Sequence, residues 1–262
     1  MSLVYLITSL PRLKRDKKSP ISRRHFIEQV KKNLNSKEFL DFNLILLFED
    51  IEKIICIKND ALIYNDNLSS KLIYNKLKKY KHKLHINLSE FNDLYLKEPS
   101  HVLLRKWYQT VYAEANSLFF KEWISFSLNL DEVISAILAK QDNLSKNDFI
   151  YQMKGRFDSC SQQMMLNYDD SNLGISKRFA WYEQIKKILF SENFLKAEKE
   201  LNSLKLKEIN KLLGTDVFSI DIIIAYYFHL RIIEREANFS YEKGNKILKL
   251  ILHDYLEELH DN

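Results

Sequence analysis

Residues 101–130 read HVLLRKWYQTVYAEANSLFFKEWISFSLNL and contain neither glycine nor proline. Two apolar stripes run along this stretch at helical spacing. One stripe comprises Leu104, Trp107, Val111, Ala115 and Leu118, and the other comprises Tyr108, Tyr112, Ala115, Phe119, Trp123, Phe126 and Leu130. Because the stripes are adjacent, they form one wide apolar face. The pattern predicts a single spine helix over 101–129, roughly 43 Å long at ~1.5 Å per residue, with shorter helices packed around it.

The rest of the chain is equally poor in helix-breaking residues, with four glycines and three prolines in 262 residues. Since both residue types interrupt helices or mark turns, their scarcity predicts an all-α fold. It also leaves no glycine-rich phosphate loop, and no G-x-S-x-G, P-loop or dinucleotide fingerprint occurs. These absences favour a protein that binds partners or transmits force over an enzyme. We therefore expect no catalytic residue and no cofactor.

The amino-acid composition and the first residues indicate the cellular compartment of the protein. Apolar residues make up 46% of the chain, which is enough for a substantial core. Cys56 and Cys160 lack the spacing of a disulfide framework, so we interpret them as small buried hydrophobes in a reducing, cytoplasmic protein. The first seven residues place an apolar run before the charges, the reverse of a secretory signal. No stretch approaches the ~18–20 apolar residues of a membrane span.

The remaining helices are predicted from apolar spacing and capping residues. Ser22 is expected to cap one helix, Asp131 another, and Ser145 with Asp148 a third. Residues 220–228 are apolar nearly all round, which predicts a central buried helix. Further helices are expected over about 40–58, 70–80, 176–190, 193–213, 217–236 and 241–260, with a loop at 59–70. The Gly- and Asp-containing stretch 155–175 is predicted to connect two helical lobes, residues 1–154 and 155–262.

Charge is unevenly distributed along the chain. The formal net charge is +5, but residues 1–130 hold 22 Lys and Arg against 14 Asp and Glu, and the remainder is slightly acidic. Residues 10–21 include two of the three prolines and are predicted to form an exposed loop. The loop carries the candidate interface residues Arg12, Lys14, Arg15, Lys17 and Lys18. A second basic stretch, 71–83, includes Tyr74 and Tyr80, so nucleic-acid binding through 12–24 or 71–83 is the alternative function.

Metal and nucleophile patterns are weak. His82 and His85 lie among lysines that repel a cation, and His253 and His260 are two helical turns apart. Residues 240–243 match S-x-x-K, but a helix start capped by Ser240 explains them better, since so short a pattern arises by chance. We interpret these residues as structural or solvated and expect no metal site.

Several segments resemble, in order along the chain, a bacterial family of unknown-function proteins encoded with V-type ATPases. That family is itself similar to the C-type rotor-adaptor component (also called d) of archaeal-type and vacuolar ATPases. The resembling segments are 5–11 (YLITSLP), 20–22 (PIS), 128–137 (LNLDEVISAI), 139–140 (AK), 173–181 (LGISKRFAW) and 225–235 (AYYFHLRIIER).

The resemblance implies a two-lobed, non-catalytic helical adaptor of a rotary ATPase that links the central shaft to the membrane rotor ring in ion transport. Its partners would be the other ATPase subunits, its place the cytoplasmic face of the inner membrane, and nucleic acid would not be a partner. At 262 residues the chain is shorter than a typical C-type rotor adaptor, which implies that one lobe is reduced.

Overall fold

The computed structural model describes residues 3–15, 17, 19–36, 38–47, 49–50, 108–109, 111–153 and 159–238. Within these ranges the regular secondary structure is α-helical and contains no strand, which confirms the predicted all-α class for the described residues. The chain divides into two compact units, one formed by Met1–Leu34 with Lys187–Asn262 and one by Asn35–Lys186. We call them the end unit and the middle unit. This division differs from the predicted boundary between residues 154 and 155.

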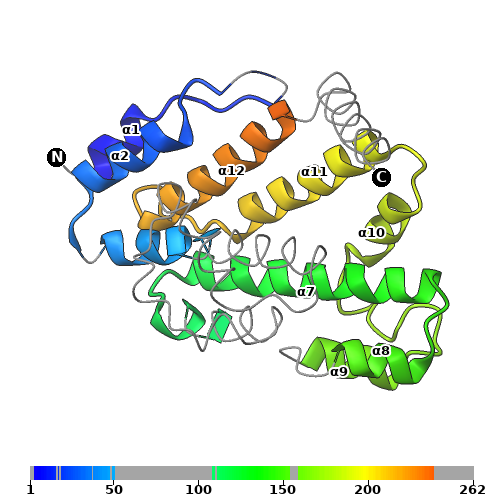
Figure 1. Ribbon diagram of the computed structural model, residues 1–262. Helices are drawn as coiled ribbons and strands as arrows, with labels where there is room; N and C mark the ends of the chain where they lie inside the picture. The colour runs from blue at the N-terminus through cyan, green and yellow to red at the C-terminus, as the bar shows by residue number, and fades with distance from the viewer. Residues whose placement is uncertain are drawn as a thin grey trace, which may run out of the picture. The chain divides into compact units, whose positions relative to one another are not determined.

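The end unit is organised around one buried helix. Its described helices are α1 (Leu3–Ser9), α2 (Arg23–Asn33), α11 (Phe194–Leu212) and α12 (Ile220–Asn238). Helix α12 contacts each of the other three and lies between α2 and α11 (Figure 1). The most deeply buried residues of α12 are Ile223, Ile224, Tyr227 and Leu230. The predicted central buried helix over 220–228 is therefore confirmed.

Helix α2 packs on α12 because the two helices have complementary apolar faces. The fully buried Phe26 of α2 stacks on two rings of α12, with centroid distances of 5.1 Å to Tyr226 and 6.0 Å to Tyr227. The predicted cap Ser22 is confirmed, since its side chain accepts a hydrogen bond from the backbone N–H of His25. An apolar stripe at helical spacing reveals that α2 needs a partner, but not that the partner lies some 200 residues away.

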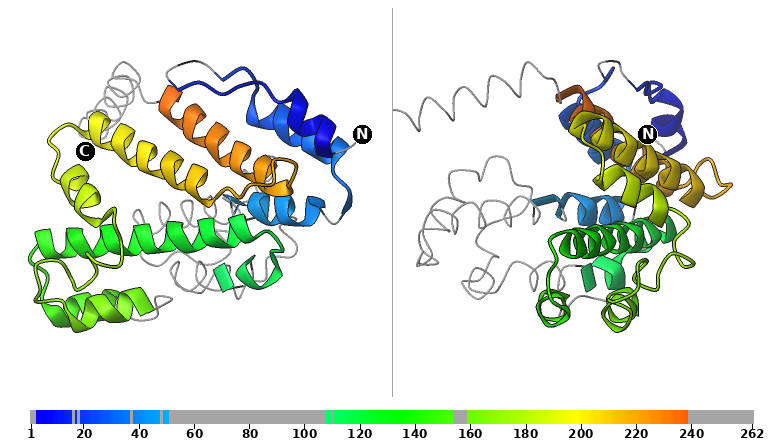
Figure 2. Two further views of the ribbon diagram at one scale, coloured as in Figure 1. Left: turned by 180° about the vertical axis from the view of Figure 1, so that it is seen from behind. Right: turned by 90° about the vertical axis from the view of Figure 1, so that its right-hand side faces the viewer.

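The middle unit contains α7 (Leu118–Gln141), α8 (Lys146–Met153) and α9 (Ser159–Leu166), together with helical residues at 36, 38–47, 49–50 and 111–114. Helices α8 and α9 lie side by side, and α9 also contacts α7 (Figures 1 and 2). Helix α10 (Tyr182–Leu189) begins in this unit and crosses the division between Lys186 and Lys187. The buried face of α7 includes Phe119, Phe120, Trp123, Ile124, Val133 and Ile137.

The predicted spine helix over 101–129 is wrong in its bounds. Residues 115–117 are not helical, and α7 begins at Leu118. The carboxylate of Asp41 accepts hydrogen bonds from the backbone N–H groups of Asn116 at 2.7 Å and Ser117 at 3.1 Å, while Ser117 Oγ accepts one from Phe120 at 3.0 Å. These acceptors satisfy N–H groups that a continuous helix would have paired internally. Residues 101–107 lie outside the described residues.

Helix α7 also continues past the position where a new helix was expected. Asp131 lies in its interior and is not a cap, which corrects that prediction. The helix ends instead at Gln141 with Asp142 as its C-cap, and the following Asn143 adopts a left-handed φ of 54°. The backbone N–H of Asn143 bonds to Lys140 and that of Leu144 to Ala139, a Schellman arrangement. The predicted pairing of Ser145 with Asp148 is confirmed at the start of α8.

The stretch predicted to join two lobes belongs to the interior of the middle unit. Residues 159–166 form α9, and residues 167–181 form hydrogen-bonded turns, so the helix predicted over 176–190 begins only at Tyr182. Tyr168 donates a 2.6 Å hydrogen bond to the carbonyl of Leu144 and stacks on Phe149. Gly174 has a φ of +68°, and a Cβ there would meet the Asn167 side chain at 2.7 Å. The helices predicted over 193–213 and 217–236 are confirmed, and those over 70–80 and 241–260 lie outside the described residues.

Candidate functional site

The described residues of the predicted basic loop are non-helical, lie between α1 and α2 and reach toward the C-terminal end of α12 (Figure 1). Helix α1 ends at Ser9, and Pro11 and Pro20 lie in the segment that follows. Because proline has no backbone N–H, the loop cannot be held by a continuous backbone ladder. Side-chain contacts hold it instead, and three of them join the loop or its end to α12.

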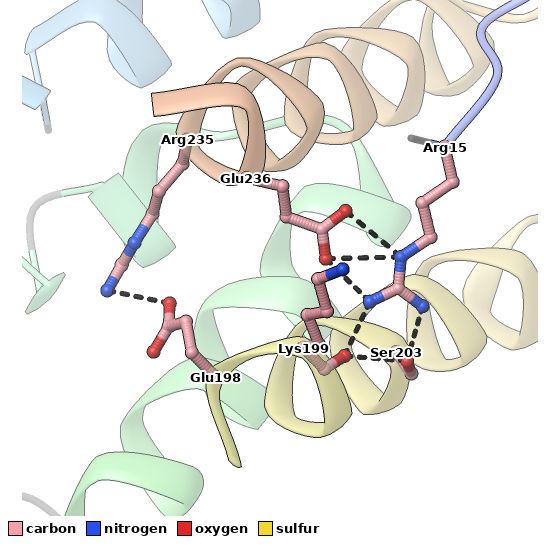
Figure 3. Close-up of polar contacts among 6 residues, drawn as sticks. All are labelled: Arg15, Glu198, Lys199, Ser203, Arg235 and Glu236. Atoms are coloured by element: carbon pink, nitrogen blue, oxygen red, sulfur yellow. Dashed lines mark hydrogen bonds and ion pairs between the residues drawn. The ribbon is translucent and has the colours of Figure 1, made fainter. Parts of the chain in front are cut away.

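Arg15 forms the most extensive of these contacts (Figure 3). Its Nε lies 3.1 Å and 3.0 Å from the two carboxylate oxygens of Glu236, and a terminal nitrogen lies 2.5 Å from one of them. The guanidinium also donates to the hydroxyl of Ser203 and to the backbone carbonyl of Lys199, both on α11. The Glu236 side chain is only 9% exposed. One arginine therefore joins the loop to two helices and neutralises a nearly buried carboxylate.

A second arginine fixes the end of the loop. The backbone N–H of Arg23 donates to Glu234 at 2.9 Å, and its Nε donates to the other carboxylate oxygen at 2.6 Å. Helices α11 and α12 are themselves joined by Arg235 and Glu198, 2.9 Å apart (Figure 3). These ion pairs hold the loop, α11 and α12 as one connected structure.

Tyr226 provides the third contact between the loop and α12. Its hydroxyl donates a 2.8 Å hydrogen bond to the carbonyl of Pro11, and burial raises the pKa of Tyr226 to about 12. Burial lowers the pKa of His229, which lies one turn further along α12, and the Glu236 carboxylate opposes this shift in part. The imidazole is therefore uncharged at neutral pH.

Replacing Tyr226 with phenylalanine tests this contact. Since the hydroxyl is bonded when neutral, Tyr226→Phe should lower the free energy of unfolding by ~1 kcal/mol at pH 8. The folded pKa lies above the unfolded value of 10.0, so the hydroxyl's contribution is complete below pH 10 and is lost as the pH rises toward 12. Urea unfolding of both proteins between pH 8 and 12 measures the difference. A difference that stays constant over this range would contradict the assignment.

Comparison with known proteins places the chain in a family. A family model described as "Protein of unknown function (DUF2764)" matches residues 1–258. The chain belongs to the DUF2764 family. No curated protein and no solved structure matches it.

In this DUF2764 chain the five candidate interface residues differ in their exposure and in their bonds within the chain. Arg12, Lys14 and Lys17 are exposed, whereas Arg15 is half-buried and bonded to Glu236. Lys18 lies outside the described residues. The structure thus gives Arg15 an intramolecular role, and an interface role for Arg12, Lys14 and Lys17 stays a prediction.

Sequence reasoning missed the α12 carboxylates that anchor the loop. A usable signal was present, because Glu234 and Glu236 lie near the C-terminal end of the helix, where the helix dipole disfavours negative charge. Acidic residues at the end of an otherwise apolar helix therefore indicate cationic partners elsewhere in the chain. Which arginines supply them is not apparent from sequence spacing, since Arg15 and Glu236 are 221 positions apart.

Other candidate chemistry in the DUF2764 chain is limited. In the described part of the chain, no group of three or more His, Cys, Asp and Glu side chains could hold a metal ion. Cys160 is buried, as predicted. The histidine pairs, the second basic stretch, Cys56 and residues 240–243 lie outside the described residues. None of the described helices combines the length and apolarity that crossing a membrane requires.

Proposed function

We propose that this DUF2764 chain is a non-catalytic helical adaptor of a bacterial V-type (archaeal-type) rotary ATPase, linking the central shaft to the membrane rotor ring at the cytoplasmic face of the inner membrane. The proposal rests first on the resemblance carried by ordered segments from the N-terminus to residue 235. A torque-bearing adaptor needs stiff elements and no reactive side chain.

One structural observation supports the proposal. Segments 5–11 and 225–235, which carry the resemblance at opposite ends of the described chain, meet in the end unit through the Tyr226–Pro11 hydrogen bond. Arg15 and Arg23 add ion pairs around the same contact. Ion pairs between distant segments resist the sliding of these segments past one another, as force transmission requires.

Affinity purification tests the adaptor function. The tagged chain, expressed from its own locus and extracted from gently solubilised membranes, should recover the ATPase head, shaft and rotor-ring subunits together. The control is an untagged strain processed in parallel. Recovery of the chain without any ATPase subunit would contradict the proposal.

Nucleic-acid binding, the rival function, is weakened by the position of Arg15. Its guanidinium is bonded within the chain, which leaves the first basic stretch with fewer cations for phosphates. Fluorescence polarisation with labelled RNA and DNA at low salt distinguishes the two functions. Tight, salt-sensitive binding would favour the rival function over the adaptor.

A further inference from the structure

Exposure alternates along the basic loop. Pro11, Leu13 and Arg15 are half-buried, whereas Arg12 and Lys14 between them are exposed, and Lys17 beyond them is exposed as well. A period of two is the pattern of locally extended backbone with one side against the protein. The inward side is held by Arg15 on Glu236 and by the Pro11 carbonyl on Tyr226. The outward direction of Arg12 and Lys14 is therefore imposed by the anchors on either side of them.

The outward cations differ from four other arginines of the end unit. Arg15, Arg23, Arg24 and Arg235 each form an ion pair with a carboxylate. No carboxylate among the described residues forms an ion pair with Arg12, Lys14 or Lys17. We call these three residues the basic strap. Their charges are available to a partner.

We propose that the basic strap is a docking surface for an acidic surface of a partner protein. This inference rests on the proposed function, because the partner would be another member of the ATPase assembly. The strap is held in place before the partner binds, so little conformational entropy is lost on docking. Carboxylates presented by a folded partner supply the complementary charge and fix its register.

A protein partner fits the strap better than nucleic acid does. The strap offers three described cations, and Lys18 beside them lies outside the described residues. Even four cations are fewer than the ~6–10 phosphate contacts of a typical strongly salt-dependent nucleic-acid binder. The loop sequence around the strap, LPRLKRDK at 10–17, also contains no aromatic ring on which a base could stack.

A zero-length carbodiimide cross-linker provides a direct test, because it joins a lysine amine to a carboxylate only where the two are in contact. The tagged full chain is cross-linked in solubilised membranes and the joined peptides are identified by mass spectrometry. We expect links from Lys14 or Lys17 to Asp or Glu of a partner protein. Lys196 and Lys207, exposed lysines on α11 of the same unit, should give none.

Charge reversal provides the quantitative test. The variant Arg12→Glu/Lys14→Glu/Lys17→Glu should reduce the recovered partner at least ~10-fold at near-physiological salt. The matched control Lys31→Glu/Lys196→Glu/Lys207→Glu makes the same change in net charge at exposed sites of the end unit and should change recovery less than ~2-fold. Both variants should unfold at the wild-type urea midpoint, because the substituted side chains are exposed.

The outcomes separate the docking surface from the proposed function. Cross-links from the strap to an acidic protein outside the ATPase would support the docking surface and contradict the adaptor function. If the strap variant recovers ATPase subunits as fully as the wild type does, this result would support the adaptor function and contradict the docking surface. Recovery of no protein partner would overturn both. Strap-dependent binding to a single-stranded RNA or to phosphatidylglycerol vesicles, without cross-links to protein, would overturn the docking surface.

Discussion

Phe26→Ala is expected to lower the free energy of unfolding of the end unit by about 3–5 kcal/mol. The ring is fully buried and stacks on Tyr226 and Tyr227, so truncation removes apolar burial and leaves a cavity between α2 and α12. The loss is large because the stack joins the two chain segments that form the unit. Urea unfolding followed by circular dichroism measures it.

The control for this prediction is the same change at an exposed position. Phe194, at the start of α11 in the same unit, is 87% exposed. Phe194→Ala should change the free energy of unfolding by less than ~0.5 kcal/mol. Equal effects of the two substitutions would show that α2 is not packed on α12 as described.

Arg15→Ala is expected to lower the free energy of unfolding by about 2 kcal/mol. Removing one partner of a buried ion pair typically costs ~3–5 kcal/mol, because the other charge is left without compensation. The Arg15 side chain is 31% exposed, so water reaches the pair and reduces the cost. The remaining loss comes from the unpaired Glu236 carboxylate and from the hydrogen bonds to Ser203 and Lys199.

Two further variants isolate the ion pair. Arg12→Ala removes the same charge from an exposed position of the same loop and should change stability by less than ~0.5 kcal/mol. In a Glu236→Gln background, Arg15→Ala should cost less than it does in the wild type, because no carboxylate is left unpaired. Additive effects of Arg15→Ala and Glu236→Gln would rule out a direct interaction between the two side chains.

The Arg15 and strap variants address different parts of one loop. Loss of Arg15 weakens the attachment of the loop to α11 and α12, whereas charge reversal at Arg12, Lys14 and Lys17 leaves the attachment intact. A partner that binds the strap should therefore be lost in both variants, with reduced stability only in the first. This comparison distinguishes a docking surface from a purely structural loop.

Local features of the fold were accessible from sequence because they depend on neighbouring residues. Helical spacing and the scarcity of glycine and proline predicted the all-α class, and the Ser22 and Ser145 caps were recognised from their positions before helices. The buried character of residues 220–228 followed from their apolar composition. In each case the deciding interactions lie within a few positions along the chain.

The tertiary structure decided the features that depend on distant residues. Asp41 interrupts the expected spine helix from 75 positions away, by accepting the backbone hydrogen bonds of residues 116 and 117. The sequence by itself determined that this chain builds helices with apolar faces and where many of them begin. Only the tertiary structure decided that α2 packs on α12 and that Arg15 turns inward while Arg12 and Lys14 face out. The physical reason is that helical periodicity is set by adjacent residues, whereas a buried ring or charge is stabilised only by the partner that folding brings to it.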